Sequence, residues 1–269
     1  MSLTIGKGPF GRAHGHLNFE RQGPAHVIFI EDCPRRMRVV VAGQTVADTR
    51  DGKLLHETGL LPVLYVPEAD VQMDRLTPTE HQTHCPFKGD ASYFRLTVGE
   101  RTEDNAVWCY REPIEGSAPI AGHLSFYGRV VDALFEEDEL VVGHIKDPYH
   151  RVDAVRSSRH VMVRVAGKVV AESRRPIIVF ETGLPPRYYL PADDVDGVFL
   201  DSSVERSTCA YKGHASYHHV VVSGERRENV VWSYHQPAAA VTKIAGHLCF
   251  DDRKVEVTVD GQPTLPVSG

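Results

Sequence analysis

A cysteine, a histidine and a glutamate recur at matching positions in the two halves of the chain, and together they could act as nucleophile, base and orienting acid. They are Cys209, His247 and Glu181 in the second half, and Cys85, His123 and Glu57 in the first. The alternative is that the cysteine belongs to the core, because Cys85 shares one face of a predicted strand with Ala91 and Tyr93. A buried thiol among apolar groups has a raised pKa and is inert. The residue types alone allow both interpretations.

Lysine and serine also recur, as Lys88 and Ser92 in the first half and as Lys212 and Ser216 in the second. A Ser–Lys dyad needs a hydrogen bond between the two side chains, but four residues of extended strand span about 13 Å. A bulge at Gly89 would shorten this path. We expect instead that the serine and the lysine point to the same face, the one away from the core.

The residues expected on that face predict a ligand pocket. Trp108 and Tyr110, two residues apart on one strand, would form an apolar wall, and Lys88 would supply a cation for an anionic or carbonyl ligand. The predicted ligand-binding residues are Glu57, Tyr65, Lys88, Tyr93, Trp108, Tyr110, Glu181, Tyr189, Lys212, Tyr217, Trp232 and Tyr234. On this hypothesis Lys212→Ala abolishes binding with little change in melting temperature. The opposing interpretation makes the aromatic residues core and the lysine a surface charge.

Histidines are clustered in each half, but not at matching positions. His81 and His84 precede Cys85, whereas the second half has Glu205 and Thr208 at the corresponding places. Neither half has the paired thiolates of a structural zinc site. We therefore expect no metal and no cofactor.

These matching positions reflect an internal duplication with a constant offset of 124 residues. Val41-Ala42-Gly43 returns as Val165-Ala166-Gly167, and Glu57-Thr58-Gly59-Leu60 returns as Glu181-Thr182-Gly183-Leu184. Solenoid repeats of about 20 to 50 residues are too small to bury a core alone, but a unit of this length is not. The chain is therefore predicted to contain two homologous domains in tandem.

Apolar residues alternate with a period of two, which indicates strands. Short Val- and Tyr-rich runs bounded by turn residues occur at 37–46, 93–98, 161–170, 217–222 and 255–259. One turn of helix is expected after a proline within 67–76 and again within 191–200. We predict a mainly β chain with little helix, each domain being a small antiparallel β-sandwich or half-open barrel.

The predicted boundaries follow from the repeat. They give an N-terminal arm at 1–24, a first β domain at 25–135, a linker at 136–149, a second β domain at 150–260 and a tail at 261–269. The linker begins with the acidic run Glu136-Glu137-Asp138-Glu139. An intramolecular pseudo-two-fold pairing of the two domains is expected, since such pairing would restrain loop lengths and keep the offset constant.

The composition of the chain narrows the classes of partner that it is expected to bind. The net charge is -6 and no basic run occurs, so a nucleic-acid partner is not expected. No apolar run approaches the ~18 residues of a membrane span, and the first ten residues lack the apolar core of a signal peptide. Five cysteines without a Cys-x-x-Cys pair argue against a disulfide framework. We expect a cytoplasmic protein without a membrane partner.

One ordered string of residues is repeated in both halves. It reads Val-Ala-Gly, Glu-Thr-Gly-Leu, Tyr-x-Pro-x-x-Asp-Val, Cys-x-x-Lys-Gly-x-Ala-Ser-Tyr, Trp-x-Tyr-x-x-Pro and Ile-Ala-Gly-x-Leu-x-Phe. This string resembles the family filed as domain of unknown function 427. The resemblance implies a compact, mostly β domain of bacteria and fungi, often in tandem, without an agreed activity.

A nucleotidyltransferase label is also attached to that family. Neither half has a Gly-Ser followed by a spaced Asp-x-Asp for two metal ions, nor a Gly-rich phosphate loop that opens a helix. Two hypotheses follow. The chain binds a small polar or anionic ligand and acts as a binding protein or enzyme, or it is a noncatalytic structural or interaction module built as an internal pseudo-dimer.

Overall fold

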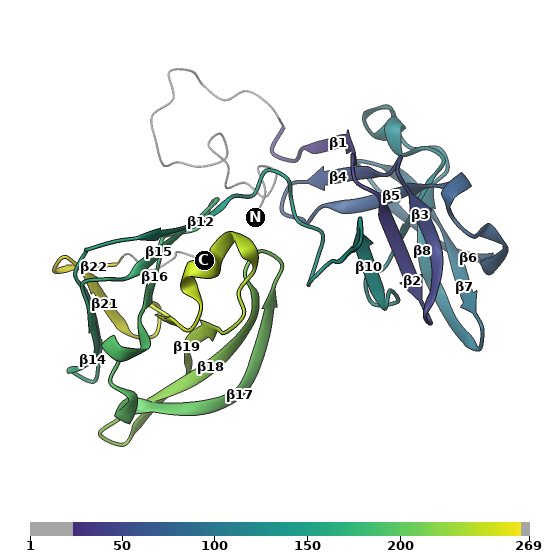
Figure 1. Ribbon diagram of the computed structural model, residues 1–269. Coiled ribbons are helices and arrows are strands. Elements are labelled where there is room, and N and C mark those ends of the chain that lie inside the picture. Colours follow the sequence, from purple (N-terminus) through teal and green to yellow (C-terminus); the bar gives the residue numbers. More distant parts are fainter. Residues whose placement is uncertain (1–23, 265–269) are drawn as a thin grey trace. The chain divides into compact units, whose positions relative to one another are not determined.

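The computed structural model describes residues 24–264, and the chain divides into two compact units, Met1–Asp147 and Pro148–Gly269 (Figure 1). The division falls within the predicted linker. The predicted N-terminal arm, 1–24, lies outside the described residues apart from Pro24, and the predicted tail, 261–269, is described as far as Thr264. Within residues 24–264, no helix has the length and apolar character needed to cross a membrane.

The first unit is built around a seven-stranded antiparallel sheet in the order β1-β4-β5-β9-β8-β7-β6. Its strands are β1 (Ile28–Asp32), β4 (Lys53–Glu57), β5 (Val63–Pro67), β6 (Leu76–Cys85), β7 (Gly89–Val98), β8 (Arg101–Tyr110) and β9 (His123–Phe126). A four-stranded sheet contains β2 (Met37–Val41), β3 (Gln44–Thr49), β10 (Ala133–Glu136) and β11 (Glu139–Leu140). Three 3-10 helices complete the unit: η2 (Glu68–Asp70), η3 (Met73–Arg75) and η4 (Glu115–Ile120).

The second unit repeats this plan strand for strand. Its seven-stranded sheet contains β12 (Val152–Arg156), β15 (Ile177–Glu181), β16 (Arg187–Leu190), β20 (Leu248–Phe250), β19 (Glu225–Tyr234), β18 (Gly213–Val222) and β17 (Leu200–Cys209), in that order. Its smaller sheet contains β13 (Val161–Val165), β14 (Lys168–Ser173), β21 (Glu256–Val259) and β22 (Gln262–Pro263), and its 3-10 helices are η5 (Ala192–Asp194), η6 (Gly197–Phe199) and η7 (Ala239–Ile244). The predicted fold class, two mainly β domains in tandem, is confirmed.

Local sequence explains the turns. Ala42 and Gly43 join β2 to β3 with positive φ at both residues, 49° and 72°, as the two central positions of a tight hairpin require. The single helical turns expected after proline are present as η2 and η5. One boundary differs from expectation, because the acidic run at 136–139 belongs to the β10–β11 hairpin. Arg35 forms an ion pair with Glu136 there, so the run is part of the edge of the smaller sheet.

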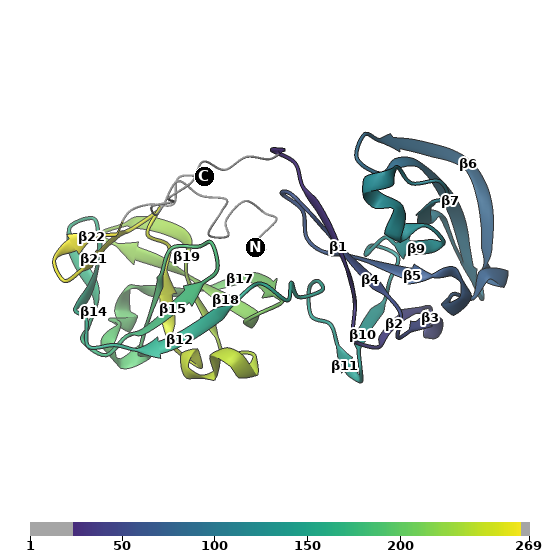
Figure 2. The ribbon, with the colours of Figure 1, turned by 90° about the horizontal axis from the view of Figure 1, so that it is seen from above.

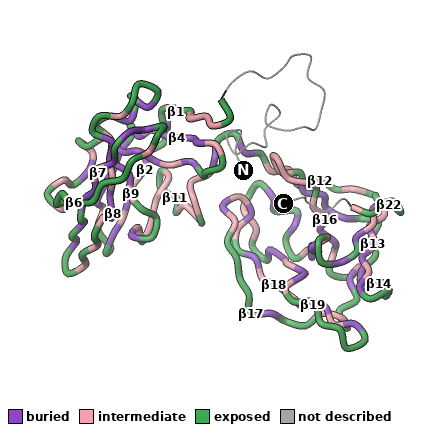
Figure 3. The backbone as a smooth tube through the Cα atoms, turned by 180° about the vertical axis from the view of Figure 1, so that it is seen from behind, coloured by how far each residue is buried: buried purple, intermediate pink, exposed green. Residues whose placement is uncertain are grey.

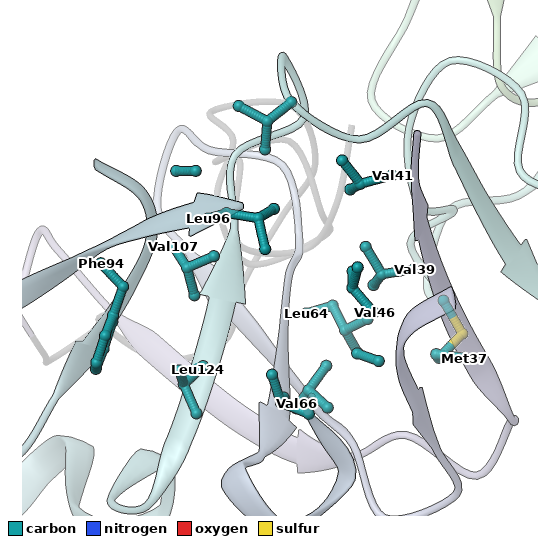
Figure 4. Close-up of a cluster of buried hydrophobic side chains, with 14 of the residues drawn as sticks. Met37, Val39, Val41, Val46, Leu64, Val66, Phe94, Leu96, Val107 and Leu124 are labelled. Carbon is teal, nitrogen blue, oxygen red and sulfur yellow. The ribbon is translucent and has the colours of Figure 1, made fainter. Parts of the chain in front are cut away.

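The two sheets of each unit pack face to face as a sandwich around an apolar core. In the first unit, Val39 and Val46 of the smaller sheet point toward Leu96 and Val107 of the larger one (Figure 4). The burial pattern follows the strands, with buried positions concentrated between the layers (Figure 3). A second apolar cluster, which includes Leu55 and Ala91, lies on the other face of the seven-stranded sheet. The larger sheet is therefore covered on both faces over part of its area.

Bulges bend the long strands of the larger sheet. The pairing of β6 with β7 shifts between Pro78 and Gln82, and that of β7 with β8 shifts between Phe94 and Leu96. Bulges increase the local twist and curvature of a sheet. Figure 2 shows β6 and β7 as curved ribbons. Asn105 supports this bend, because it adopts φ 52° and accepts a 2.6 Å hydrogen bond from the Thr79 hydroxyl.

Candidate functional site

The predicted ligand-binding aromatic residues share one face of each seven-stranded sheet, the face turned away from the smaller sheet. We call this surface the aromatic face. It contains Tyr65, Tyr93, Trp108 and Tyr110 in the first unit, and Tyr189, Tyr217, Trp232 and Tyr234 in the second. Strand pairing brings them together: Tyr93 lies opposite Trp108, and Tyr217 opposite Trp232.

Hydrogen bonds orient the rings of the aromatic face in the same way in both units. The Trp108 indole donates to the Tyr65 phenol over 3.4 Å, and the Trp232 indole donates to the Tyr189 phenol over 3.1 Å. The Tyr93 hydroxyl lies 2.8 Å from the Thr83 hydroxyl. Ser207 takes the place of that threonine in the second unit, at the same 2.8 Å from the Tyr217 hydroxyl. Tyr65 and Tyr189 are buried, whereas both tryptophans are partly exposed.

The predicted glutamate and lysine form an ion pair beside the aromatic face. Lys88 donates to Glu57, and Lys212 donates to Glu181. A histidine completes each set, because His26 and His150 each lie 3.0 Å, through Nε2, from the other oxygen of their glutamate. We call these three side chains the Glu–Lys–His network. Its lysines and glutamates are no more than 11% exposed, so the two ion pairs are largely removed from bulk water.

The network joins distant strands of one sheet. Glu57 ends β4, whereas Lys88 lies in the turn between β6 and β7, and β5, β9 and β8 come between them. In a flat sheet four strand spacings of about 4.8 Å would separate the two by roughly 19 Å. The ion pair therefore requires the sheet to curl until its two margins approach each other.

The segment that contains η4 supports the same closure. Ile114 donates its backbone N–H to the Lys88 carbonyl over 3.2 Å, and the buried Ser117 hydroxyl donates to the Phe87 carbonyl over 2.8 Å. The Phe87 ring stacks on the His26 imidazole with ring centres 3.8 Å apart. In the second unit Tyr211 packs on His150 at 4.1 Å. In each unit, the two margins of the curled seven-stranded sheet are thus joined at one end by side chains and by the segment that contains a 3-10 helix.

Burial and charge set the ionisation of these groups. Burial raises the pKa of Glu181, but the hydrogen bond from His150 and the Lys212 ammonium outweigh it and lower the pKa to about 2. Desolvation raises the pKa of Tyr65, Tyr189 and Tyr234 above the ordinary phenol value. The glutamate of the second unit is therefore a carboxylate near neutral pH, and the tyrosines are hydroxyl donors.

The candidate triad is divided between two regions of the sheet. Ile177 pairs with Tyr189 and Tyr189 pairs with Cys249, so the register places His247 six residue levels from Glu181 along the strand direction. Six levels of strand correspond to about 20 Å. His247 hydrogen-bonds the Ala245 carbonyl at 3.0 Å, as His123 does with Ala121 at 2.8 Å. Glu181 instead contacts His150, and Cys209 packs against the apolar cluster of the aromatic face.

The clustered histidines have local roles. His84 pairs with Asp90 at 2.6 Å on an exposed hairpin, and His214 lies 3.0 Å from the Thr208 hydroxyl. His219 accepts the Asn229 backbone N–H at 3.1 Å. Across residues 24–264, no three His, Cys, Asp or Glu side chains are grouped as metal ligands would be.

Sequence reasoning missed the histidine of the network. His26 and His150 are 124 residues apart, which is the repeat offset, so the duplication itself carried the signal. Both precede the first strand of their unit, outside the recurring string of motifs. The equivalent threonines Thr58 and Thr182 were missed similarly. The hydroxyl of each accepts a hydrogen bond of 2.9 Å from the backbone N–H of the residue that follows the histidine.

Two hollows of the second unit lie away from the aromatic face. One, of about 10 Å³, lies between the sheets and is lined by Val163, Leu190 and Phe250 among others. The other, of about 370 Å³, is an open depression beside β14 and η5, lined by Glu172 and Asp193–Asp196. Neither contains a predicted ligand-binding residue.

Comparison with known proteins accounts for both repeats. No curated protein matches the chain. The family model described as "Domain of unknown function (DUF427)" matches twice, over residues 29–137 and 153–261, and these two matches cover the two repeats. The sequence resemblance and the tandem duplication are thereby confirmed. The chain belongs to the DUF427 family and carries two copies of its domain.

Proposed function

We propose that the protein binds a small polar ligand at the aromatic face, beside the Glu–Lys–His network. The carrying observation is that the network recurs in both units with the same atoms in contact, at the margin of a surface rich in tyrosine and tryptophan. Binding sites commonly combine apolar and aromatic walls with a few placed polar groups. Tryptophan and tyrosine supply both, since each has an apolar ring and a hydrogen-bonding tip.

Charge refines the ligand class. The Lys88 ammonium and the Glu57 carboxylate neutralise each other, and so do Lys212 and Glu181. The lysine is therefore not a free cation for an anionic ligand. A neutral hydroxyl or amide group suits the network better, because it can accept from lysine and donate to glutamate without leaving a buried charge unpaired.

Buried ion pairs are seldom the most stable solution, and well-packed apolar residues of similar volume often do as well or better. Retention of the network in both copies is therefore consistent with a role beyond stability. An enzymatic role for the same groups is part of the proposal, with Lys212 as a donor and Glu181 as the carboxylate that orients it. The alternative, a noncatalytic structural or interaction module, is favoured by the way the network closes the sheet.

The proposal places the protein in the cytoplasm, with neither nucleic acid nor membrane as partner. All five cysteines, Cys33, Cys85, Cys109, Cys209 and Cys249, are free thiols. Free thiols persist in reducing compartments, whereas secreted proteins tend to form disulfides. Cell fractionation with a specific antibody would check this part of the proposal.

The binding proposal can be tested by NMR, because the chain has two tryptophans, one on each aromatic face. Uniformly ¹⁵N-labelled protein is screened against neutral sugars, polyols, amides and nucleosides, and the two indole N–H signals are followed. A ligand should shift at least one signal saturably. Trp108→Leu or Trp232→Leu should remove binding in the affected unit, which is followed through the backbone amide signals of that unit. Phe29→Ser, on the opposite face of the same sheet, is the matched control. Saturable shifts that spare both indoles would contradict the proposal.

A further inference from the structure

An arginine at the margin of the aromatic face recurs in both units, but its neighbour two residues earlier does not. Arg129 corresponds to Arg253, whereas Tyr127 corresponds to Asp251. The backbone is the same at this point, because Tyr127 donates its N–H to Ala106 over 3.0 Å and Asp251 donates its own to Val230 over 2.8 Å. The two units therefore present the same arginine to different partners.

In the second unit the partner is a carboxylate. Arg253 donates through Nε to Asp251 Oδ1 over 2.8 Å and through the terminal Nη2 to Oδ2 over 2.9 Å. Two parallel N–H···O bonds of this kind are the bidentate geometry in which guanidinium recognises carboxylate. The Asp251 side chain is only 7% exposed, and burial raises its pKa while Arg253 more than reverses that effect.

In the first unit the carboxylate is absent. The Arg129 guanidinium lies over the Tyr127 ring, 5.1 Å from its centre, and donates a long hydrogen bond of 3.5 Å to the Asn105 carbonyl. Among the ion pairs of residues 24–264, none includes Arg129, and its side chain is exposed. An arginine that holds a carboxylate in one copy thus has a charge without a counterpart in the other among the residues that the structure describes.

The ring beside Arg129 continues into the aromatic face. Tyr127 packs on Trp108 with ring centres 4.5 Å apart, which gives a ligand an apolar surface next to the guanidinium. In the second unit the Arg187 guanidinium instead lies 6.0 Å from the Trp232 ring and pairs with Asp252 over 2.5 Å. The residues at these two places in the first unit are Val63 and Gly128.

We propose that the first unit binds a small carboxylic acid, with the carboxylate on Arg129 and the apolar body against Tyr127 and Trp108. Asp251 acts as a built-in substitute for that carboxylate in the second unit, which is therefore closed to the same ligand. This inference rests on the proposed function, since it uses the same aromatic face, and it extends that function. It gives the first unit an acid as ligand, whose carboxylate binds an arginine outside the Glu–Lys–His network rather than the network itself.

The test follows both indole N–H signals while sodium benzoate is added to the full-length ¹⁵N-labelled protein, with benzamide as the uncharged analogue of the same shape. Benzoate should shift the Trp108 signal saturably and leave Trp232 unchanged, and benzamide, which has no charge for Arg129, should bind the first unit more weakly than benzoate. Arg129→Gln should weaken benzoate binding by about 10-fold or more, the scale of a hydrogen bond to a charged group. Arg174→Gln, an exposed arginine of the second unit, should have no effect.

Exchanging the differing residues provides a test that does not depend on loss of function. Tyr127→Asp should supply Arg129 with an internal carboxylate and abolish benzoate binding. The triple variant Arg187→Val, Asp251→Tyr, Asp252→Gly, which gives the second unit the residues of the first at these places, should make the Trp232 signal respond to benzoate. Circular dichroism spectra and melting curves check that both variants are folded.

Several outcomes would overturn the inference: no saturable shift with benzoate, equal affinity for benzamide, or wild-type affinity in Arg129→Gln. Tighter binding of phenyl phosphate than of benzoate would overturn the choice of carboxylate. A neutral ligand that shifts the indoles independently of Arg129 would sustain the proposed function and remove this inference alone.

Discussion

Lys88 and Glu57 form an ion pair between the two margins of the curled seven-stranded sheet, although β5, β9 and β8 lie between β4, which ends at Glu57, and β7, which follows the Lys88 turn. Lys212 and Glu181 repeat the arrangement in the second unit. The sheet is therefore closed at this end by side chains rather than by backbone ladder bonds. Any ligand site on the aromatic face is shaped by this contact, so the network determines both stability and the geometry of the candidate site.

Removal of one partner should destabilise its unit strongly. Lys212→Met leaves the Glu181 carboxylate buried beside His150 alone, and breaking a buried pair in this way costs about 3–5 kcal/mol. This replaces the expectation from sequence that Lys212 could be removed with little change in stability. The free energy of unfolding is measured by urea denaturation in a Trp108→Phe background, where Trp232 fluorescence reports the second unit.

Two further variants show whether the stability lost in Lys212→Met comes from the broken ion pair or simply from lost packing. Lys168→Met, an exposed lysine of the same unit, should change stability by less than about 0.5 kcal/mol. The double variant Lys212→Met, Glu181→Leu should recover much of the loss, because no buried charge remains. A double variant as unstable as the single one would show that the two side chains do not act as a pair.

Acid should weaken the second unit through Glu181. Its pKa is lowered from 4.5 to about 2 in the folded state, so its contribution is fully present above pH 4.5 and is lost as the pH falls toward 2. A shift of this size corresponds to about 3 kcal/mol. Urea denaturation at a series of pH values should show a steeper loss of stability for wild type than for Glu181→Gln. Parallel curves for the two proteins would exclude this linkage.

The period-two pattern is sufficient to place side chains on faces. It predicts that Trp108 and Tyr110 lie on one face of a strand because they are two residues apart, and they do share it. The alternative that these rings are core residues also holds in part, since Tyr110 is buried. Alternation is a local property of extended backbone, so it gives the faces within one strand. It does not say which face of the next strand adjoins them: Ser92, expected on the face of Trp108, pairs with Cys109, and Tyr93 pairs with Trp108 instead.

Contacts between residues on distant strands cannot be predicted from a local sequence pattern in the same way. Glu57 and Lys88 both recur in the duplication, but nothing local indicates that their strands meet, because the contact depends on the curl of the whole sheet. The distance between His247 and Glu181 depends equally on strand register, which no single strand encodes. His26 and His150 lie outside the predicted strands, and only the repeat offset could have identified them.

Substitution of Gly213, the glycine that follows Lys212, should destabilise the second unit. Gly213 has φ 100°, and a Cβ atom there would lie 3.2 Å from the Gln236 carbonyl oxygen. Gly213→Ala should therefore destabilise the second unit by about 1–3 kcal/mol through backbone strain. Gly197→Ala is the control, since a Cβ atom at Gly197 would meet no other atom within 4 Å and its φ is not positive. Equal unfolding free energies for the two variants would refute the argument.

The thiols should differ in reactivity according to their burial. Desolvation raises the pKa of Cys249, Cys33 and Cys109, so iodoacetamide should modify them only after unfolding. Cys85 and Cys209 are partly exposed and should react in the folded protein. Peptide mass spectrometry after timed alkylation measures each rate, with glutathione as a reference thiol.

The rate at Cys209 also tests the nucleophile hypothesis. Cys209 packs against the apolar cluster of the aromatic face, and the register places His247 far from Glu181, so nothing in this arrangement assembles a base and an orienting acid at the thiol. We expect Cys209 to react no faster than glutathione, and His247→Ala to leave the rate unchanged. A rate well above that of glutathione, reduced by His247→Ala, would instead restore the cysteine and histidine as a catalytic pair, because activation by a base requires both.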